Sequence, residues 1–96
     1  MVIYVDIDET ICTTPESRDY TKSVVVQESL DKINRLYEDG NEIVYWTARG
    51  SRSGIDWYNF THEQLIGWGA KFHKLKCDKP YYDTFIEDRS IRIEEL

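Results

Sequence analysis

Short apolar runs alternate with polar segments along the chain, at the lengths expected of strands and helices. Residues 2–7 (VIYVDI) are β-prone and continuous enough for a strand buried on both faces. Residues 9–23 are polar, contain Pro15, and are expected to form a loop. Residues 42–46 (EIVYW) predict a second strand, because aromatic and β-branched residues favour that conformation. A loop rich in Gly, Ser and Arg is expected over residues 47–54.

Two segments carry the spacing of amphipathic helices. The first is predicted from apolar residues three or four apart: Val26, Leu30, Ile33 and Tyr37, with Leu36 on the flank. Gly40 is expected to end this helix as a left-handed cap. Asp56 is expected to cap a second helix that runs to about Gly67. This helix carries four apolar residues in one broad arc: Trp57, Phe60, Leu65 and Trp68.

The order of the elements favours an α/β fold. Two further short strands are expected over residues 71–75 and 84–86. Strands that alternate with helices are typical of a parallel sheet covered on both faces. We therefore expect a single domain over residues 1–96, a Rossmann-like three-layer arrangement around a small parallel sheet. Such sheets bind ligands beyond the carboxyl ends of their strands.

Composition narrows the classes of function. Twelve Lys and Arg against eighteen Asp and Glu give a net charge of −6, which speaks against non-specific binding to nucleic acid or anionic membranes. No apolar run approaches the roughly 20 residues that a membrane-spanning helix requires. The N-terminus has no basic leader, and Cys12 and Cys77 are too few for a disulfide scaffold. We expect a cytoplasmic protein with a small anionic substrate.

Chemically active residue types follow the predicted strands. Asp6 and Asp8 end the first strand, and residues two apart on an extended chain point the same way. The other strand ends bring a hydroxyl, a lysine and an acidic pair: Thr47, Lys79, Glu87 and Asp88. Neighbouring carboxylates are costly unless a cation holds them or one is protonated, and their hard oxygens suit magnesium. The set predicts attack of a carboxylate on phosphorus, with a second carboxylate moving protons.

Each of these signals has a simpler interpretation when taken alone. Acids at strand ends often form turns or helix caps, threonine suits strands, and a lysine is usually a solvated surface charge. His62 and His73 lack metal-ligand spacing and are interpreted as a helix-surface residue and a strand residue. The prediction of chemistry therefore depends on the ordered set, with each member at a strand end.

The ordered set resembles the haloacid dehalogenase (HAD) superfamily of phosphohydrolases. Its first motif, DxDxT, stands at residues 6–10, and its second is the Thr47 that ends the strand in VYWTARG. The lysine fits best as Lys79 in DKPYYD, and the acidic pair stands as Glu87-Asp88 in TFIEDR. WTARG together with KPYYDTFIEDR is also similar to a small bacterial subgroup of HAD proteins linked to capsular polysaccharide biosynthesis.

The resemblance implies a role for each matched residue. Asp6 would be the nucleophile and a magnesium ligand, while Asp8 would be the general acid/base and give its backbone carbonyl to the metal. Thr47 would bind the phosphoryl group and Lys79 would neutralise charge, with Lys74 and Lys76 as alternative lysines. The remaining assignments are phosphate or substrate contacts at Ile7, Ala48, Arg49, Arg52 and Tyr20, and metal anchoring by Glu87 and Asp88.

Three features set this chain apart within that resemblance. Glu9 stands where many members have glycine, and Glu87 where the first acid of the pair is usually aspartate. Residues 11–25 are too short for a cap domain, so the site is expected to be open. An open site accepts bulky substrates or is covered by a second subunit. We therefore expect a homo-oligomer built on exposed aromatic residues: Trp57, Tyr58, Tyr81 and Tyr82.

The leading prediction is a magnesium-dependent phosphomonoesterase for a sugar phosphate, nucleotide or similar metabolite. One alternative is a receiver-like phospho-acceptor module, which also places carboxylates, Thr and Lys at strand ends. It is disfavoured because a receiver needs an aspartate where the middle strand delivers Thr47. Another is a catalytically weak binding protein with the same fold, which Glu87 and the short length favour. Dehalogenation is disfavoured by Asp8 and the distal acids.

Overall fold

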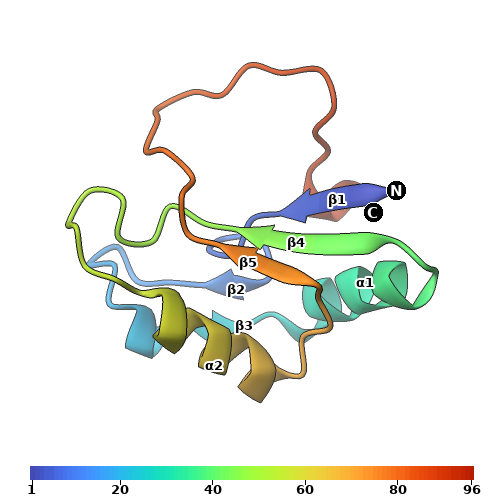
Figure 1. Ribbon diagram of the computed structural model, residues 1–96, viewed down its shortest axis with the longest axis horizontal. Coiled ribbons are helices and arrows are strands. Elements are labelled where there is room, and N and C mark those ends of the chain that lie inside the picture. The colour runs from blue at the N-terminus through green and yellow to red at the C-terminus, as the bar shows by residue number, and fades with distance from the viewer.

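Three parallel strands form the central sheet, and two helices connect them (Figure 1). The computed structural model describes residues 1–96. Its elements in chain order are β1 (Val2–Val5), β2 (Cys12–Thr13), the 3₁₀ helix η1 (Tyr20–Lys22), β3 (Val24–Val25), α1 (Gln27–Glu38), β4 (Glu42–Trp46), α2 (Tyr58–Trp68), β5 (Lys74–Lys76) and the 3₁₀ helix η2 (Ile93–Glu95). The sheet order is β1-β4-β5, and β2 and β3 form a separate antiparallel pair.

The strongly patterned elements lie where the sequence predicts them. The strand β4 has the predicted bounds, β1 ends two residues early, and α1 begins one residue after Val26. Gly40 follows α1 with a φ of +98°, and its N–H donates to the carbonyl of Tyr37 at 3.1 Å. A left-handed residue at this place lets the chain satisfy the last carbonyls of the helix, so the predicted cap is confirmed.

The second helix differs in detail from its prediction. Asp56 accepts a hydrogen bond from the N–H of Tyr58 at 2.9 Å, but α2 begins at Tyr58 and Trp57 holds the cap position. Its buried side chains are Thr61 and Leu65, whereas Phe60 is exposed. The predicted apolar arc is therefore wrong at Phe60, because α2 buries a polar threonine that serves the site described below. Neither helix has the length and apolar character needed to cross a bilayer.

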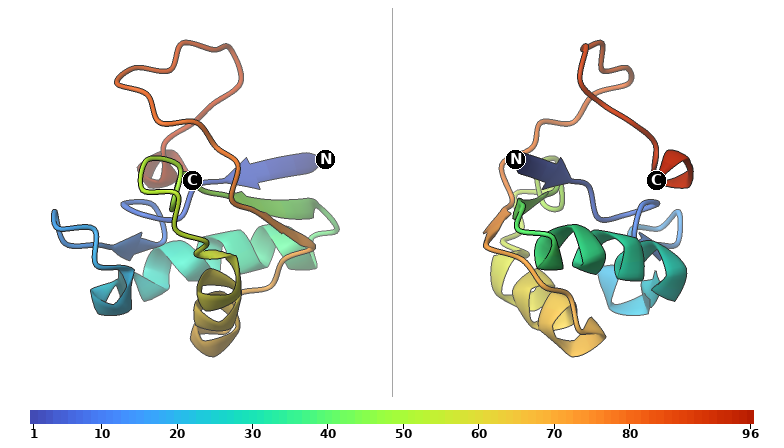
Figure 2. Two further views of the ribbon diagram at one scale, coloured as in Figure 1. Left: turned by 60° about the vertical axis from the view of Figure 1, so that its left-hand side comes forward. Right: turned by 90° about the vertical axis from the view of Figure 1, so that its right-hand side faces the viewer.

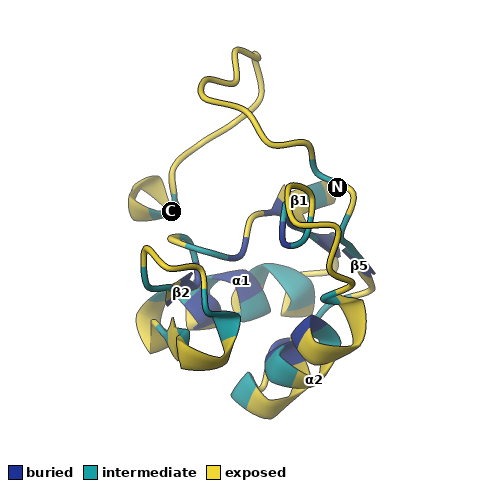
Figure 3. Cartoon of the chain, turned by 90° about the vertical axis from the view of Figure 1, so that its left-hand side faces the viewer, coloured by how far each residue is buried: buried dark blue, intermediate teal, exposed yellow.

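Both helices pack on one face of the sheet. Alternate strand residues, among them Val5, Ile43 and Tyr45, form one buried cluster with Leu30 of α1 and Leu65 of α2. Figure 2 shows both helices on the same side, and Figure 3 shows the buried residues between them and the sheet. The chain crosses from β1 to β4 to β5 in one direction, and right-handed crossovers then place every helix on one face. The predicted three-layer arrangement is therefore wrong.

The face of the sheet that lies opposite the helices is covered by no helix and is here called the open face, although Val44 at its centre is buried. Val2 and Tyr4 point to this face and are exposed, and the rings of Tyr4 and Trp46 meet edge to face at 5.6 Å. Parallel sheets are normally covered on both faces. The open face is thus an unusual feature of this fold.

The predicted fourth strand is absent. Residues 80–92, here called the arm, are exposed, and their one backbone-to-backbone hydrogen bond is at the end of the arm, where the carbonyl of Arg92 accepts the N–H of Glu95 in η2. The arm leaves the sheet after β5, arches beyond β1, and returns at η2 (Figure 1). A three-residue apolar run has no stability as an isolated strand, because its backbone groups need a neighbouring strand. In this chain the segment 84–86 has no such neighbour.

The core contains one polar atom without a partner, which gives a first prediction. Tyr45 is fully buried, its hydroxyl makes no hydrogen bond, and burial raises its pKa. Removing a buried unsatisfied hydroxyl removes its desolvation cost, so Tyr45→Phe is expected to raise the free energy of unfolding by about 1 kcal/mol. Urea unfolding measures this change, with Tyr4→Phe on the open face as an unaffected control. A less stable Tyr45→Phe protein would contradict the prediction and indicate a water partner for the hydroxyl.

Candidate active site

A cleft of about 910 Å³ opens where β1 and β4 end. Its lining brings together most of the predicted site residues: Asp6, Asp8, Thr47, Ala48, Arg49, Arg52 and Lys79. Tyr20 also lines it, as do Tyr81 and Tyr82 at the start of the arm. The segment between β1 and α1 holds only the β2–β3 pair and η1, so no cap domain covers the cleft. The carboxyl ends of parallel strands are the usual place for a ligand in such a sheet.

Asp6 presents a carboxylate to this cleft. Its Oδ1 accepts the N–H of Ile7 at 2.9 Å, and its Oδ2 lies 3.5 Å from the Nζ of Lys79. The side chain is 45% exposed, which leaves one oxygen edge open to a ligand. Burial raises the pKa of Asp6, and the charge of Lys79 and the Ile7 N–H only partly oppose this. Asp6 is therefore a partly desolvated carboxylate that a cation or a Lys79 contact must hold in its charged form.

Lys79 is the lysine of the site. Its side chain is only 12% exposed, and its Nζ lies 5.4 Å from the ring centroids of both Trp46 and Tyr82. The carbonyl of Thr47 accepts the Lys79 N–H at 3.2 Å and so fixes the start of the loop beside β4. The alternatives, Lys74 and Lys76, belong to β5 and do not line the cleft. Of the three lysines, Lys79 is the one that lies in the cleft, and its role there stays a prediction.

Asp8 is held by Arg49 in a two-pronged ion pair. Arg49 donates from Nη2 to Oδ1 at 2.8 Å and from Nε to Oδ2 at 3.1 Å. Thr14 donates a further hydrogen bond to Oδ1 at 2.5 Å. Burial alone would raise the pKa of Asp8, but the hydrogen bonds and charge of Arg49 outweigh it, with help from Thr14, and the pKa is lowered. Asp8 is thus kept ionised, which suits a base and disfavours a proton donor.

Arg49 has a different place from the predicted substrate contact. It is buried, and its Nη1 donates to Thr61 Oγ1 at 3.1 Å and to Gln64 Oε1 at 2.8 Å. The ring of Tyr20 lies 4.4 Å from the centre of its guanidinium. Four of its five N–H groups are engaged by protein, two of them by Asp8, so Arg49 positions Asp8 and keeps one N–H, on Nη2, without a protein partner. Thr61 and Gln64 were not among the predicted site residues. The one feature of the sequence that could have identified them is their polar character on the side of α2 that packs against the core.

The loop after β4 turns sharply beneath the cleft. Thr47 is buried, and its Oγ1 accepts the N–H of Arg49 at 3.2 Å. The N–H of Ala48 has no partner and is available to an anionic ligand. Gly50 has a φ of +86°, and a Cβ there would stand 2.1 Å from the carbonyl oxygen of Ile55. Only glycine fits this turn, so the VYWTARG segment builds a loop of defined shape.

The backbone conformation determines the positions of two further residues in segment 6–10, Ile7 and Glu9. Ile7 is fully buried in the core, and its N–H is taken by Asp6, so the predicted phosphate contact at Ile7 is wrong. Glu9 has a φ of +64°, in the left-handed region that favours glycine. The Glu9 carboxylate pairs at the surface with Arg18 at 3.1 Å. The chain thus accepts a strained turn next to Asp8.

Glu87 and Asp88 do not reach the cleft. Both are exposed on the arm, where Glu87 accepts the N–H of Arg89 at 2.7 Å and Asp88 lies 3.9 Å from the Arg89 side chain. Hydrogen bonds from Ser90 and the Arg89 backbone lower the pKa of Glu87. The predicted acidic end of a fourth strand is therefore wrong for this chain, because the strand that would deliver the pair is not formed.

The donor set of this chain does not by itself fit magnesium. Both Asp8 oxygens are engaged by Arg49, and Asp6 shares its Oδ2 with Lys79. No group of three or more Asp, Glu, His or Cys side chains gathers anywhere in the structure. Magnesium needs several oxygen ligands in near-octahedral order. We therefore assign no reaction step to a metal.

The comparisons with known proteins bear on the fold alone. The sequence matches no described protein family, and no curated protein matches it. A crystal structure of a structural genomics target from Vibrio cholerae is similar, with a TM-score of 0.87 and 24% identity. The match covers 98% of this chain and 85% of that chain. The α/β arrangement with a small parallel sheet is therefore shared with an experimentally determined structure.

Proposed function

We propose that the protein is a phosphomonoester hydrolase that works through an aspartyl-phosphate on Asp6. The observation that carries this proposal is the half-exposed Asp6 carboxylate in an open cleft, with the Lys79 ammonium 3.5 Å from its Oδ2. A carboxylate beside a fixed cation, where a phosphate can approach, is suited to attack on phosphorus. A cleft of this size accepts a small phosphorylated metabolite such as a sugar phosphate or a nucleotide.

The first step transfers the phosphoryl group to Asp6. A carboxylate oxygen of Asp6 forms a bond to phosphorus as the bond from phosphorus to the substrate oxygen breaks. The substrate oxygen leaves with that electron pair as an alkoxide, which takes a proton from water to give the alcohol. Lys79 neutralises the charge gathered between Asp6 and the phosphoryl oxygens. The free N–H of Ala48 offers a further donor to those oxygens.

The second step releases phosphate with Asp8 as the base. Arg49 keeps Asp8 ionised, so its carboxylate can take a proton from a water that attacks phosphorus. The bond from phosphorus to Asp6 then breaks, and the Asp6 carboxylate is restored. The same ion pair works against Asp8 as the acid that protonates the leaving alcohol. The two carboxylates therefore divide the chemistry: Asp6 attacks and Asp8 accepts protons.

This division of roles predicts that the rate of hydrolysis depends on the leaving group of the ester. Without a strong general acid, aryl phosphates, whose phenolate leaves readily, are expected to turn over at least tenfold faster than alkyl phosphates. Steady-state assays of both ester classes, with Asp6→Asn as a blank, test the function and the division together. No hydrolysis of any phosphate ester would contradict the proposed function. Equal rates for both classes of ester would instead indicate that Asp8 protonates the leaving alcohol.

Magnesium dependence stays a separate proposal. The acids that would complete a magnesium site are those of the arm, and they reach Asp6 only if an arm comes to lie beside β1. Assays should therefore titrate magnesium for wild type, Glu87→Gln and Asp88→Asn. If the arm acids serve the site, both variants need more magnesium than wild type, and chelation stops turnover. Identical titrations would leave Glu87 and Asp88 as surface residues.

A catalytically weak relative of such an enzyme is the second candidate. The observation that favours it is that the arm acids do not line the cleft, where the acid besides Asp6 and Asp8 is Glu9, which pairs with Arg18. In that case phosphate would bind in the cleft and turnover would be lacking. Calorimetric titration with inorganic phosphate, alongside the ester assays, separates a binding protein from a hydrolase.

A further inference from the structure

The outer edge of β1 is unpaired. The carbonyl of Met1 accepts the N–H of Glu42, and β1 then runs parallel to β4 from Val2 to Val5. In a parallel ladder, alternate residues bond to the same neighbour, so the backbone groups of Val2 and Tyr4 point to the other side. No strand of this chain lies there. Such an edge is a template for another strand.

The arm carries a segment of the kind that such an edge pairs with. Thr84, Phe85 and Ile86 are β-prone residues, and Ile86 is 91% exposed while Phe85 is 54% exposed. The backbone groups of residues 84–86 have no hydrogen-bond partner in their own chain. Figure 3 shows the arm as one continuous exposed stretch. An unpaired apolar segment and an unpaired strand edge thus coexist in the same molecule.

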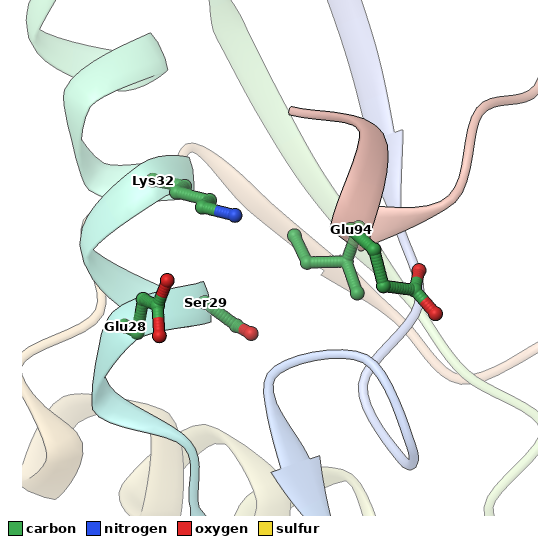
Figure 4. Close-up of a pocket in the computed structure, with 5 residues that line it drawn as sticks. Glu28, Ser29, Lys32 and Glu94 are labelled. Carbon is green, nitrogen blue, oxygen red and sulfur yellow. The ribbon is translucent and has the colours of Figure 1, made fainter.

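Both ends of the arm are held by contacts with the rest of the chain, and the segment between them does not pair with β1. At one end, Lys79 is bound to the carbonyl of Thr47 and lies over Trp46. At the other, Ile93 packs against the core, and η2 faces α1 across a small surface pocket lined by Glu28, Ser29, Lys32 and Glu94 (Figure 4). The arch between these anchors passes beyond β1 (Figures 1 and 2) and makes no backbone hydrogen bond with it.

We propose that β1 pairs with the arm of a second copy of this chain, and that the exchange is reciprocal. Segment 84–86 of each copy would add a strand to the free edge of β1 in the other, in a two-fold symmetric dimer. Neighbouring residues of a strand point to opposite faces, so Phe85 would lie beside the exposed Val2 and Tyr4 of the open face and Ile86 would point to the helix side.

The charges of the arm and of the open face are complementary, which favours pairing between two copies of this chain. The arm carries three acids close together, Asp83, Glu87 and Asp88. The open face carries Lys76, whose Nζ lies 5.6 Å from the centroid of the Tyr4 ring, and the exposed Lys74. The acids of one copy and the lysines of the other would share one face of the extended sheet, and their opposite charges would steer the two copies together. The dimer is argued from the strand edge and not from the chemistry of the cleft, so it can form whether or not the protein is a hydrolase. An arm that pairs with β1 is also the arrangement that a magnesium role of Glu87 and Asp88 requires.

Sedimentation equilibrium gives the first test, on the full chain. A monomer has a mass of 11.4 kDa, and the exchanged dimer has twice that mass. Ile86→Asp places a charge in the new strand and is expected to raise the dimer dissociation constant at least tenfold. Ile66→Asp is the matched control, because Ile66 is 54% exposed on α2, outside both surfaces, and should leave the dimer intact. A wild-type protein that stays monomeric at high concentration would overturn the proposal.

Cysteine cross-linking distinguishes a second copy from the arm of the same chain. In a Cys77→Ser background, one protein carries Tyr4→Cys and another carries Phe85→Cys. Oxidation of the mixture is expected to give a covalent heterodimer of both proteins. If instead only the double variant cross-links, at monomer mass, the arm folds onto its own β1 and the proposal is wrong. Absence of any cross-link in both experiments overturns it equally.

Discussion

Asp6→Asn is expected to abolish phosphate-ester hydrolysis while making the folded protein more stable at neutral pH. The amide keeps the shape of the side chain but lacks the attacking oxygen, so no aspartyl-phosphate forms. Because burial raises the pKa of Asp6, the fold favours its protonated form. That stabilisation is present below the unfolded value of 3.8 and is lost as pH rises through the folded pKa. A neutral asparagine does not ionise, so the variant does not lose this stabilisation as the pH rises.

Turnover assays and thermal unfolding at two pH values check both effects. The midpoint of unfolding of Asp6→Asn should exceed that of wild type at pH 7, and the two should converge in acid. Glu63→Gln, which removes an exposed carboxylate from α2, serves as the control that changes neither quantity. Near-normal turnover in Asp6→Asn would contradict the covalent mechanism. Asp8→Asn should instead slow turnover by roughly two to four orders of magnitude and still bind a phosphate mimic.

Arg49→Met is expected to be the most destabilising substitution in the site. It leaves the Asp8 carboxylate, which is 17% exposed, without its two-pronged partner. Removing one member of a buried ion pair costs about 3–5 kcal/mol, because the other charge stays desolvated. The pair also lowers the pKa of Asp8, so its contribution is present above 3.8 and is lost as pH falls through the folded pKa. The difference from wild type should therefore shrink in acid.

Urea unfolding at neutral and acid pH measures this difference. Arg52→Met is the matched control, because Arg52 is exposed and stacks on Tyr81 at the rim of the cleft. Its substitution should change stability by less than about 0.5 kcal/mol. An Arg49→Met penalty that does not vary with pH would show that packing, and not the ion pair with Asp8, is what the substitution removes.

The parts of the fold that the sequence predicts are those fixed by local pattern. The apolar spacing of α1, the β-prone run of β4 and the glycine after α1 each specify their element without help from distant residues. Asp6, Asp8, Thr47 and Lys79 were predicted to meet because each follows a strand or precedes one, and parallel strands end at one edge.

The parts that the sequence did not predict depend on distant partners. Residues 84–86 look like a strand, but whether they form one depends on a neighbouring edge that the pattern cannot supply. The open face follows from the direction in which the chain crosses the sheet, which the order of elements alone leaves undetermined. An arginine at position 49 could contact either the substrate or Asp8, and the sequence around it does not distinguish the two. Hydrogen bonds to Thr61 and Gln64, which lie far along the chain, direct it to Asp8.

The central claim is that Asp6 carries the phosphoryl group during turnover, and mass spectrometry of acid-quenched reactions tests it most directly. Wild-type protein quenched during hydrolysis of an aryl phosphate is predicted to gain the mass of one phosphoryl group, located on the peptide that contains Asp6. Asp8→Asn, which slows release, should accumulate more of this species, and Asp6→Asn should show none. A wild-type enzyme that hydrolyses the ester without any covalent species, or an Asp6→Asn protein that still becomes labelled, would contradict the account.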